Sequence, residues 1–146
     1  YTGGSNRNPT YEQVSSGDTN HAEVVEITFD ADVISFKTLV EVFFKTHNPT
    51  TLNKQGNDVG TQYRSAIFYV DDKQKTEAEE VKKQIEEEKI YEDPVVTTIE
   101  EFKEFFEAEK YHQDFYKNNP TQGYCQVVIN PKLAKFRKEF LPLLKK

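Results

Sequence analysis

The clearest hydrophobic pattern along the chain predicts an amphipathic helix that ends near His47. Its apolar side chains recur at i, i+3, i+4, i+7 and i+8, which is the spacing of one helix face. Ser35 is a suitable N-cap before this stretch, and Asn48-Pro49 is typical of a helix end. The apolar residues of this face are Phe36, Leu39, Val40, Phe43 and Phe44.

Later segments are also predicted to be helical. A charged helix begins at Asp71-Asp72 and runs to Ile90, and residues 105–116 form another candidate. Asn130-Pro131 begins a final helix, because proline is well tolerated in the first helical turn. The apolar stripes of the charged and the final helix are Ala78, Val81 and Ile85, and Leu133, Phe136, Phe140 and Leu144.

Alternating apolar and polar residues predict strands between these helices. In the first candidate, residues 21–29, Glu23 stands at the end of the more apolar face, because alternate side chains of a strand point the same way. Strands that alternate with helices predict an α+β or α/β sandwich in one domain, residues 1–146. The other strand candidates are 63–70, 95–99 and 124–129, and residues 1–20 and 50–62 have loop composition.

The composition narrows the possible functions. The 146 residues carry a net charge of −6, which opposes nonspecific nucleic-acid binding. No stretch approaches the roughly 18 apolar residues of a membrane span. One cysteine excludes an internal disulfide and a cysteine-only zinc site, and neither a metal-ligand spacing nor a glycine-rich phosphate loop is present. We therefore expect no metal, no bound cofactor, no nucleic acid and no membrane partner.

Few residues could carry chemistry. Cys125 is the only thiol, and a lone buried cysteine is often an inert small hydrophobic residue. Partial desolvation at the strand face would raise the pKa of Glu23 and let it donate a proton, whereas the alternative is a carboxylate turned to water. Tyr11 and Tyr63 are either packing residues or hydrogen-bond donors. Asp58, between two glycines, is either a turn former or a site residue.

Several long motifs, taken in order, resemble one family. The likeness covers nearly the whole chain up to Cys125 and is with peptide-methionine (S)-S-oxide reductases, the A-type methionine sulfoxide reductases. The motifs are "YTGG…NPTYEQVSSGDTNHAEVVEITFD", "HNPTTLNKQGNDVGTQYRSAIFY", "AEKYHQDFYKNNP" and "GYC".

The resemblance implies thiol chemistry on a sulfoxide. In this family a thiolate attacks the sulfoxide sulfur, the oxygen is protonated and leaves as water, and the cysteine becomes a sulfenic acid. A second cysteine condenses with it to a disulfide, which thioredoxin reduces. The implied function is reduction of methionine-S-sulfoxide, free and in proteins, as repair of oxidised proteins. We expect a cytoplasmic monomer that binds no cofactor and uses thioredoxin or another thiol as reductant.

The resemblance also implies roles for individual residues. Glu23 in "HAE" matches the family's proton donor. Tyr11 in "PTYEQV" and Tyr63 in "GTQYR" match two tyrosines that hydrogen-bond the sulfoxide oxygen, an oxyanion-type arrangement. Asp58 in "GNDVG" matches an aspartate near the active centre. The matches of the C-terminal motifs are His112 and Tyr124 as substrate-binding residues, and Cys125 as a candidate resolving thiol.

The sequence departs from the family pattern at its beginning. The family's nucleophile lies in a GCFWG motif just before "GYTGG", and this chain begins inside that stretch, with no Met and no Trp. We therefore expect an upstream segment that carries the nucleophile, and an inactive chain without it. The implied fold is α+β, a ferredoxin-like α/β sandwich core with long irregular connections. We expect its first strand and helix to be missing, and this loss to leave an unpaired sheet edge or an exposed groove. The alternative function is a non-catalytic binding module that keeps the sulfoxide pocket.

Overall fold

The computed structural model describes residues 1–143, which fall into two compact units divided between Glu107 and Ala108. Each unit is described by itself. In the described part of the chain, no helix is both long and apolar enough to cross a membrane.

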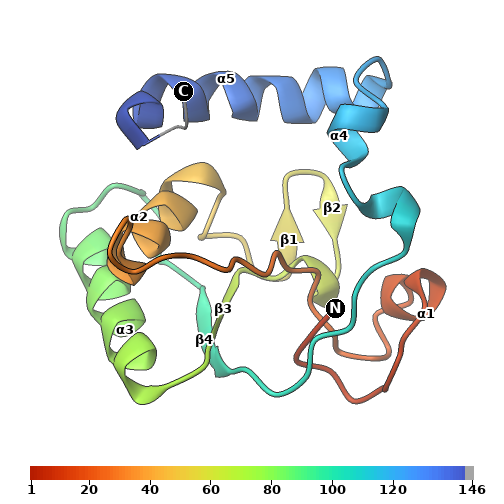
Figure 1. Ribbon diagram of the computed structural model, residues 1–146, viewed down its shortest axis with the longest axis horizontal. Helices are drawn as coiled ribbons and strands as arrows, with labels where there is room; N and C mark the ends of the chain where they lie inside the picture. Colours follow the sequence, from red (N-terminus) through yellow and green to blue (C-terminus); the bar gives the residue numbers. More distant parts are fainter. Residues whose placement is uncertain (144–146) are drawn as a thin grey trace. The chain divides into compact units, whose positions relative to one another are not determined.

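The first unit is built on a βαβ element. Strand β3 (Ala66–Tyr69) pairs in parallel with β4 (Thr98–Glu101), and the register runs from Ala66↔Thr98 to Tyr69↔Glu101. Parallel neighbours need a crossover connection, which is supplied here by helix α3 (Asp72–Glu87), as Figure 1 shows. This arrangement agrees with the predicted α+β class.

The hydrophobic core lies where α2 (Phe36–Thr46) packs against α3. The predicted caps are confirmed, because Ser35 accepts a hydrogen bond from the Thr38 N–H and Asp71 accepts one from the Gln74 N–H. The predicted stripe of α3 is buried along its whole length. The buried residues of this core are Val40, Phe44, Val81, Ile85 and Val95.

Short elements complete the first unit. Helix α1 (Tyr11–Ser15) begins with a capping box in which Thr10 and Gln13 bond each other's backbone N–H groups. Strands β1 (Lys54–Gln55) and β2 (Asp58–Val59) form an antiparallel hairpin. A 3₁₀ turn, η1 (Thr61–Tyr63), leads into β3, so that this strand begins three residues later than the pattern predicted.

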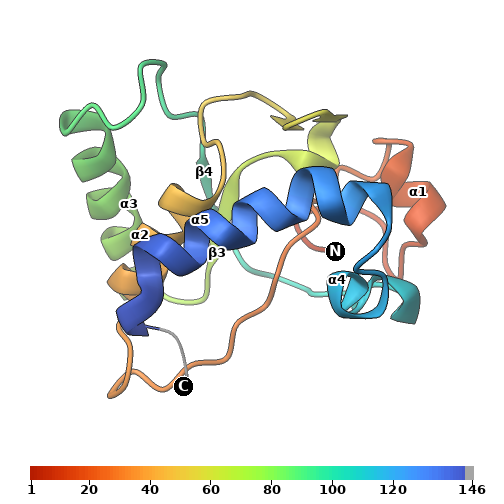
Figure 2. The same ribbon diagram turned by 90° about the horizontal axis from the view of Figure 1, so that it is seen from above.

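The predicted strand over residues 21–29 is wrong. Only Ala22 makes a β-bridge, with Thr2, and Val25 is 84% exposed. Figures 1 and 2 both draw the segment after it as an extended trace. An alternating pattern favours an extended backbone, but a strand also needs a partner with which to share hydrogen bonds, and residues 23–30 join no ladder among the described residues.

Two further boundaries differ from the sequence pattern. The predicted strand 95–99 is shifted and becomes β4. Residues 105–116 are not one helix, because the backbone at Phe105 and Phe106 is used in tertiary pairing. Thr2 bridges Phe105, and the Phe106 N–H donates to the Tyr1 carbonyl at 2.9 Å.

The second unit is helical where the structure describes it. A 3₁₀ turn, η2 (Lys110–His112), precedes α4 (Phe115–Asn118). A π-helical turn, η3 (Cys125–Ile129), then runs directly into α5 (Asn130–Phe140), the long helix seen from above in Figure 2. The 3₁₀ turn η4 (Leu141–Leu143) follows.

The predicted strand over residues 124–129 is therefore wrong, although its Val-Val-Ile run has strand propensity. No strand occurs in the described residues 108–143, so a helix satisfies this backbone locally, with the Asn130 N–H donating to the Cys125 carbonyl. The predicted final helix is confirmed, with proline in its first turn. The last residue of its predicted stripe, Leu144, lies outside the described residues.

Candidate active site

Glu23 follows the bridge between Thr2 and Ala22, and its backbone is fixed although its side chain is not buried. The Glu23 N–H donates to the Gln62 carbonyl at 2.9 Å. The residue is exposed and belongs to no strand, so the predicted desolvation by a strand face is wrong. An exposed carboxyl is accessible to a substrate, which is compatible with a role as proton donor. This role stays a prediction.

Tyr63 ends the 3₁₀ turn that also carries Gln62. Burial is the main cause that raises the pKa of the Tyr63 phenol, followed by the charges of Glu23, Tyr11 and Asp58. The Gln62 side chain acts in the opposite direction through a hydrogen bond. These electrostatic contributions show that the fold brings together four of the residues singled out in the sequence.

Gln62 joins the segments that carry these residues, and sequence reasoning missed it. Its side chain is buried, and Nε2 donates to the carbonyl of Ser15, at the end of the helix that Tyr11 begins, at 3.2 Å. Its backbone carbonyl accepts from Glu23. Asp58 begins β2 and pairs with Gln55, so it closes the turn formed by Gly56 and Asn57.

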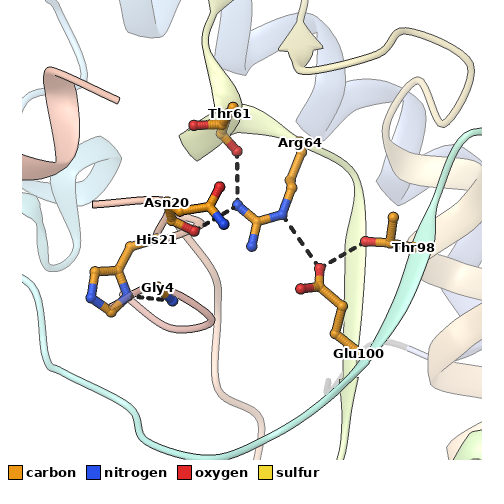
Figure 3. Close-up of polar contacts among 7 residues, drawn as sticks. All are labelled: Gly4, Asn20, His21, Thr61, Arg64, Thr98 and Glu100. Atoms are coloured by element: carbon orange, nitrogen blue, oxygen red, sulfur yellow. Dashed lines mark hydrogen bonds and ion pairs between the residues drawn. The ribbon is translucent and has the colours of Figure 1, made fainter. Parts of the chain in front are cut away.

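Arg64 is a second residue that sequence reasoning missed (Figure 3). Its Nη1 donates to the Asn20 carbonyl at 3.1 Å and to the Thr61 carbonyl at 3.0 Å. Its Nε donates to Glu100 Oε2 at 3.3 Å, and Thr98 donates to the same carboxylate oxygen at 2.8 Å. The only sequence signal for Gln62 and Arg64 was their position on either side of Tyr63 in "GTQYR".

His21 holds the N-terminal loop beside this site. Its Nδ1 accepts from the Gly4 N–H at 3.1 Å, as Figure 3 shows, and its Nε2 lies 2.6 Å from the Asn6 carbonyl. An N–H donor on one ring nitrogen and a carbonyl acceptor on the other define the neutral tautomer with the proton on Nε2. His21 is 2% exposed, and these contacts make it a structural residue.

His47 has a similar structural setting at the end of α2. Its Nδ1 donates to the Phe43 carbonyl at 2.5 Å, and its Nε2 lies 2.7 Å from Ser65 Oγ. Ser65 Oγ in turn lies 2.6 Å from Thr97 Oγ1. This chain of polar groups, buried at Ser65 and Thr97, ties α2 to the residues just before β3 and β4.

The remaining predicted site residues belong to the second unit. His112 Nε2 lies 3.7 Å from Glu109 Oε2, and its ring centroid is 4.2 Å from that of Tyr111. Tyr124 is 48% exposed, whereas Cys125 is a fully buried free thiol. Glu23, Tyr11 and Asp58 lie near Tyr63 within the first unit, whereas His112, Tyr124 and Cys125 are described within the second unit alone.

Within residues 1–143 no cluster of His, Cys, Asp or Glu side chains could hold a metal ion. The chemistry that the first-unit site offers is that of hydrogen-bond donors and carboxyl groups. Phenol and carboxyl groups can donate protons or hydrogen bonds to an electronegative atom of a ligand.

Comparison with known proteins shows the family of the chain. A family model described as peptide methionine sulfoxide reductase matches residues 1–143. The peptide methionine sulfoxide reductase MsrA of Polynucleobacter asymbioticus is 54% identical over 99% of this chain and 76% of its own length. The corresponding protein of Chromobacterium violaceum is 53% identical over 99% of this chain and 82% of its own length.

Solved structures agree with these matches. The crystal structure of Mxr1 from Saccharomyces cerevisiae in reduced form has a TM-score of 0.79 and 35% identity, covering 86% of this chain and 71% of that chain. Together the fold and the matches define an oxidoreductase. The chain belongs to the peptide methionine sulfoxide reductase family. The family resemblance and the α+β fold predicted from the sequence are thereby confirmed.

Proposed function

We propose that this chain reduces methionine-S-sulfoxide to methionine, with Glu23 as the proton donor and Tyr11 and Tyr63 as hydrogen-bond donors to the sulfoxide oxygen. Membership of the family supports the reaction. The observation that supports the site is the convergence of Glu23, Tyr11 and Asp58 on Tyr63, seen in the raised pKa of its phenol.

The chemistry explains why these groups are needed. A thiolate attacks the sulfoxide sulfur, and the protonated oxygen leaves as water. A water molecule then attacks the cysteine sulfur, which releases the thioether and leaves the cysteine as a sulfenic acid. Negative charge develops on the sulfoxide oxygen as its bond to sulfur breaks, so a carboxylic acid and two neutral phenols stabilise the transition state. An ordinary phenol, with a pKa of about 10, is already protonated in the neutral range, and the raised pKa of Tyr63 keeps its hydroxyl a donor to still higher pH.

The second unit supplies the groups for the later steps. Cys125 is the proposed second thiol, which condenses with the sulfenic acid to a disulfide and releases water. The buried Cys125 thiol must become accessible for this step. His112 and Tyr124 are proposed to bind the substrate. Thioredoxin or another dithiol then reduces the disulfide, and both free methionine sulfoxide and oxidised proteins are proposed substrates of a cytoplasmic monomer.

Asp58 is proposed to act through charge rather than proton transfer. Its charge is among the causes that raise the pKa of Tyr63, and we propose that it helps to keep the phenol in its donor form. The variant Asp58→Asn is therefore expected to lower the pKa of Tyr63 and to slow the reaction less than loss of the proton donor does.

The test is turnover of a peptide with methionine-S-sulfoxide or its R epimer, with dithiothreitol as reductant, by the full gene product. Glu23→Gln is expected to slow the S reaction by about 10²–10⁴-fold, the usual contribution of general acid catalysis. Glu26→Gln is the matched control, because Glu26 is an exposed carboxylate in the same segment. An unchanged rate for Glu23→Gln would remove this residue from the mechanism, and sulfoxide binding without any turnover would favour the binding-module alternative.

A further inference from the structure

The guanidinium of Arg64 connects three separate segments of the first unit. Nη1 donates to two backbone carbonyls, those of Asn20 and Thr61, at 3.1 and 3.0 Å, while Nε donates to Glu100 Oε2 at 3.3 Å. Figure 3 shows these contacts spread around one planar group. Arginine suits this position because its donors point in fixed directions in a single plane.

The surroundings of Arg64 hold this geometry in place. The Arg64 side chain is only 12% exposed, and that of Glu100 is 33% exposed. Thr98 donates to the Glu100 carboxylate from the same strand, which orients the carboxylate toward Arg64. The N-terminal loop also approaches closely, since a Cβ atom on Gly3 would lie 3.0 Å from Nη2.

The two carbonyls belong to the segments that carry the proposed acid and one proposed donor. Asn20 has a positive φ of 60° and precedes Glu23 by three residues. Thr61 precedes Tyr63 by two residues in the 3₁₀ turn. The hydrogen bond from the Glu23 N–H to the Gln62 carbonyl joins the same segments. Arg64 thus closes a junction whose two sides bear Glu23 and Tyr63.

We propose that Arg64 is a positioning residue that holds the Glu23 carboxyl and the Tyr63 hydroxyl at a fixed separation, so that both reach one substrate oxygen. The proposal rests on the proposed function for its catalytic consequence, but the separation itself can be measured without turnover. Placement errors of about 1 Å can cost an enzyme around 100-fold in rate, so the effect of losing this junction is expected mainly in kcat.

The direct measurement is the electrostatic coupling between Glu23 and Tyr63. The titration of Tyr63 is followed by NMR of ¹³C-labelled tyrosine, with its signal assigned by Tyr63→Phe. In the unmodified chain, Glu23→Gln is expected to lower the pKa of Tyr63, because a nearby negative charge is removed. In an Arg64→Met background, the same substitution is expected to shift this pKa by less than half as much.

Arg7 provides a matched control for both the coupling measurement and the turnover measurement. Arg7 also pairs with a glutamate, Glu104, at 3.7 Å, but its side chain is 80% exposed. Arg7→Met is expected to leave both coupling and turnover unchanged. Arg64→Met is expected to lower kcat at least tenfold with a smaller change in KM, and Arg64→Lys, which keeps the charge but not the planar fork, is expected to recover only part of the loss.

The outcomes separate this proposal from the proposed function. A folded Arg64→Met protein with undiminished coupling and unchanged kcat overturns the positioning role. If Arg64→Met does not fold, Arg64→Lys and Glu100→Gln decide by the same coupling measurement, and full coupling in both overturns the proposal. If Glu23→Gln has no effect on turnover, the proposed function fails, while reduced coupling in Arg64→Met still supports the positioning role.

Discussion

Replacing Gly60 by alanine probes the packing beneath the site. Gly60 has φ 148° and ψ 160°, a region of the backbone map that is essentially restricted to glycine. A Cβ atom here would lie 2.7 Å from Cδ and 2.9 Å from Nε2 of Gln62, and closer still to its Oε1. Because the Gln62 side chain is 4% exposed, it has little room to move away.

The expected cost has two parts. The strained backbone contributes about 1–3 kcal/mol. Displacement of the Gln62 side chain breaks its hydrogen bond to the Ser15 carbonyl, which contributes about 1 kcal/mol. We therefore expect Gly60→Ala to lower the free energy of unfolding by about 3 kcal/mol. It is also expected to raise the pKa of Tyr63 further, because the Gln62 hydrogen bond that lowers this pKa is weakened.

Gly56→Ala is the matched control in the same loop. Gly56 has φ 57°, and a Cβ atom added there would meet nothing within 4 Å. Only the left-handed backbone cost of about 1 kcal/mol applies. Urea unfolding followed by circular dichroism measures both variants. Equal losses of stability, or an unchanged Tyr63 titration in Gly60→Ala, would refute the argument that Gly60 is needed to make room for Gln62.

Three other predictions follow from the contacts of the first unit. The pKa of Tyr63 is raised, so its ¹³C titration should have a midpoint above about pH 10, and a midpoint at or below about 10 contradicts this. The stability that the neutral phenol contributes is fully present below about pH 10 and is lost as the pH rises through the pKa of the folded state. Phe44 is fully buried in the core, so Phe44→Ala should cost about 3–5 kcal/mol in urea unfolding, and a loss below about 1 kcal/mol would be inconsistent with that packing. Ser65→Ala removes the hydroxyl between His47 and Thr97 and should cost about 1–3 kcal/mol by the same assay, whereas an unchanged midpoint would show that this chain contributes nothing.

Helices were predicted well because their signals are local. The caps at Ser35 and Asp71 and the stripe of α3 depend on residues within a few positions of one another. Strands depend on a partner that is distant in sequence. Residues 21–29 and 124–129 carry strand-like patterns, but neither has a ladder among the described residues, and the second continues into a helix instead.

The same difference between local signals and contacts distant in sequence applies to the candidate site. Glu23, Tyr11, Tyr63 and Asp58 were found because their motifs resemble a family, and the fold brings them together. Sequence reasoning could not supply the surroundings of these residues. The exposure of Glu23 depends on pairing that the pattern cannot show. The contacts of Arg64 are mainly with backbone carbonyls, which leave no trace in side-chain identity.

The site residues of the first unit come from elements too short to position them on their own. Helix α1 has five residues and β2 has two, and the segment around Glu23 has no regular structure. Consecutive side chains of the turn at Thr61–Tyr63 point in different directions, so one turn can reach several segments. Gln62 contacts Glu23 and the end of α1, and the next residues are Tyr63 and Arg64. Because the site depends on these few residues, substitutions of Gln62, Tyr63 or Arg64 should impair the reaction more than substitutions of the exposed residues that follow Glu23.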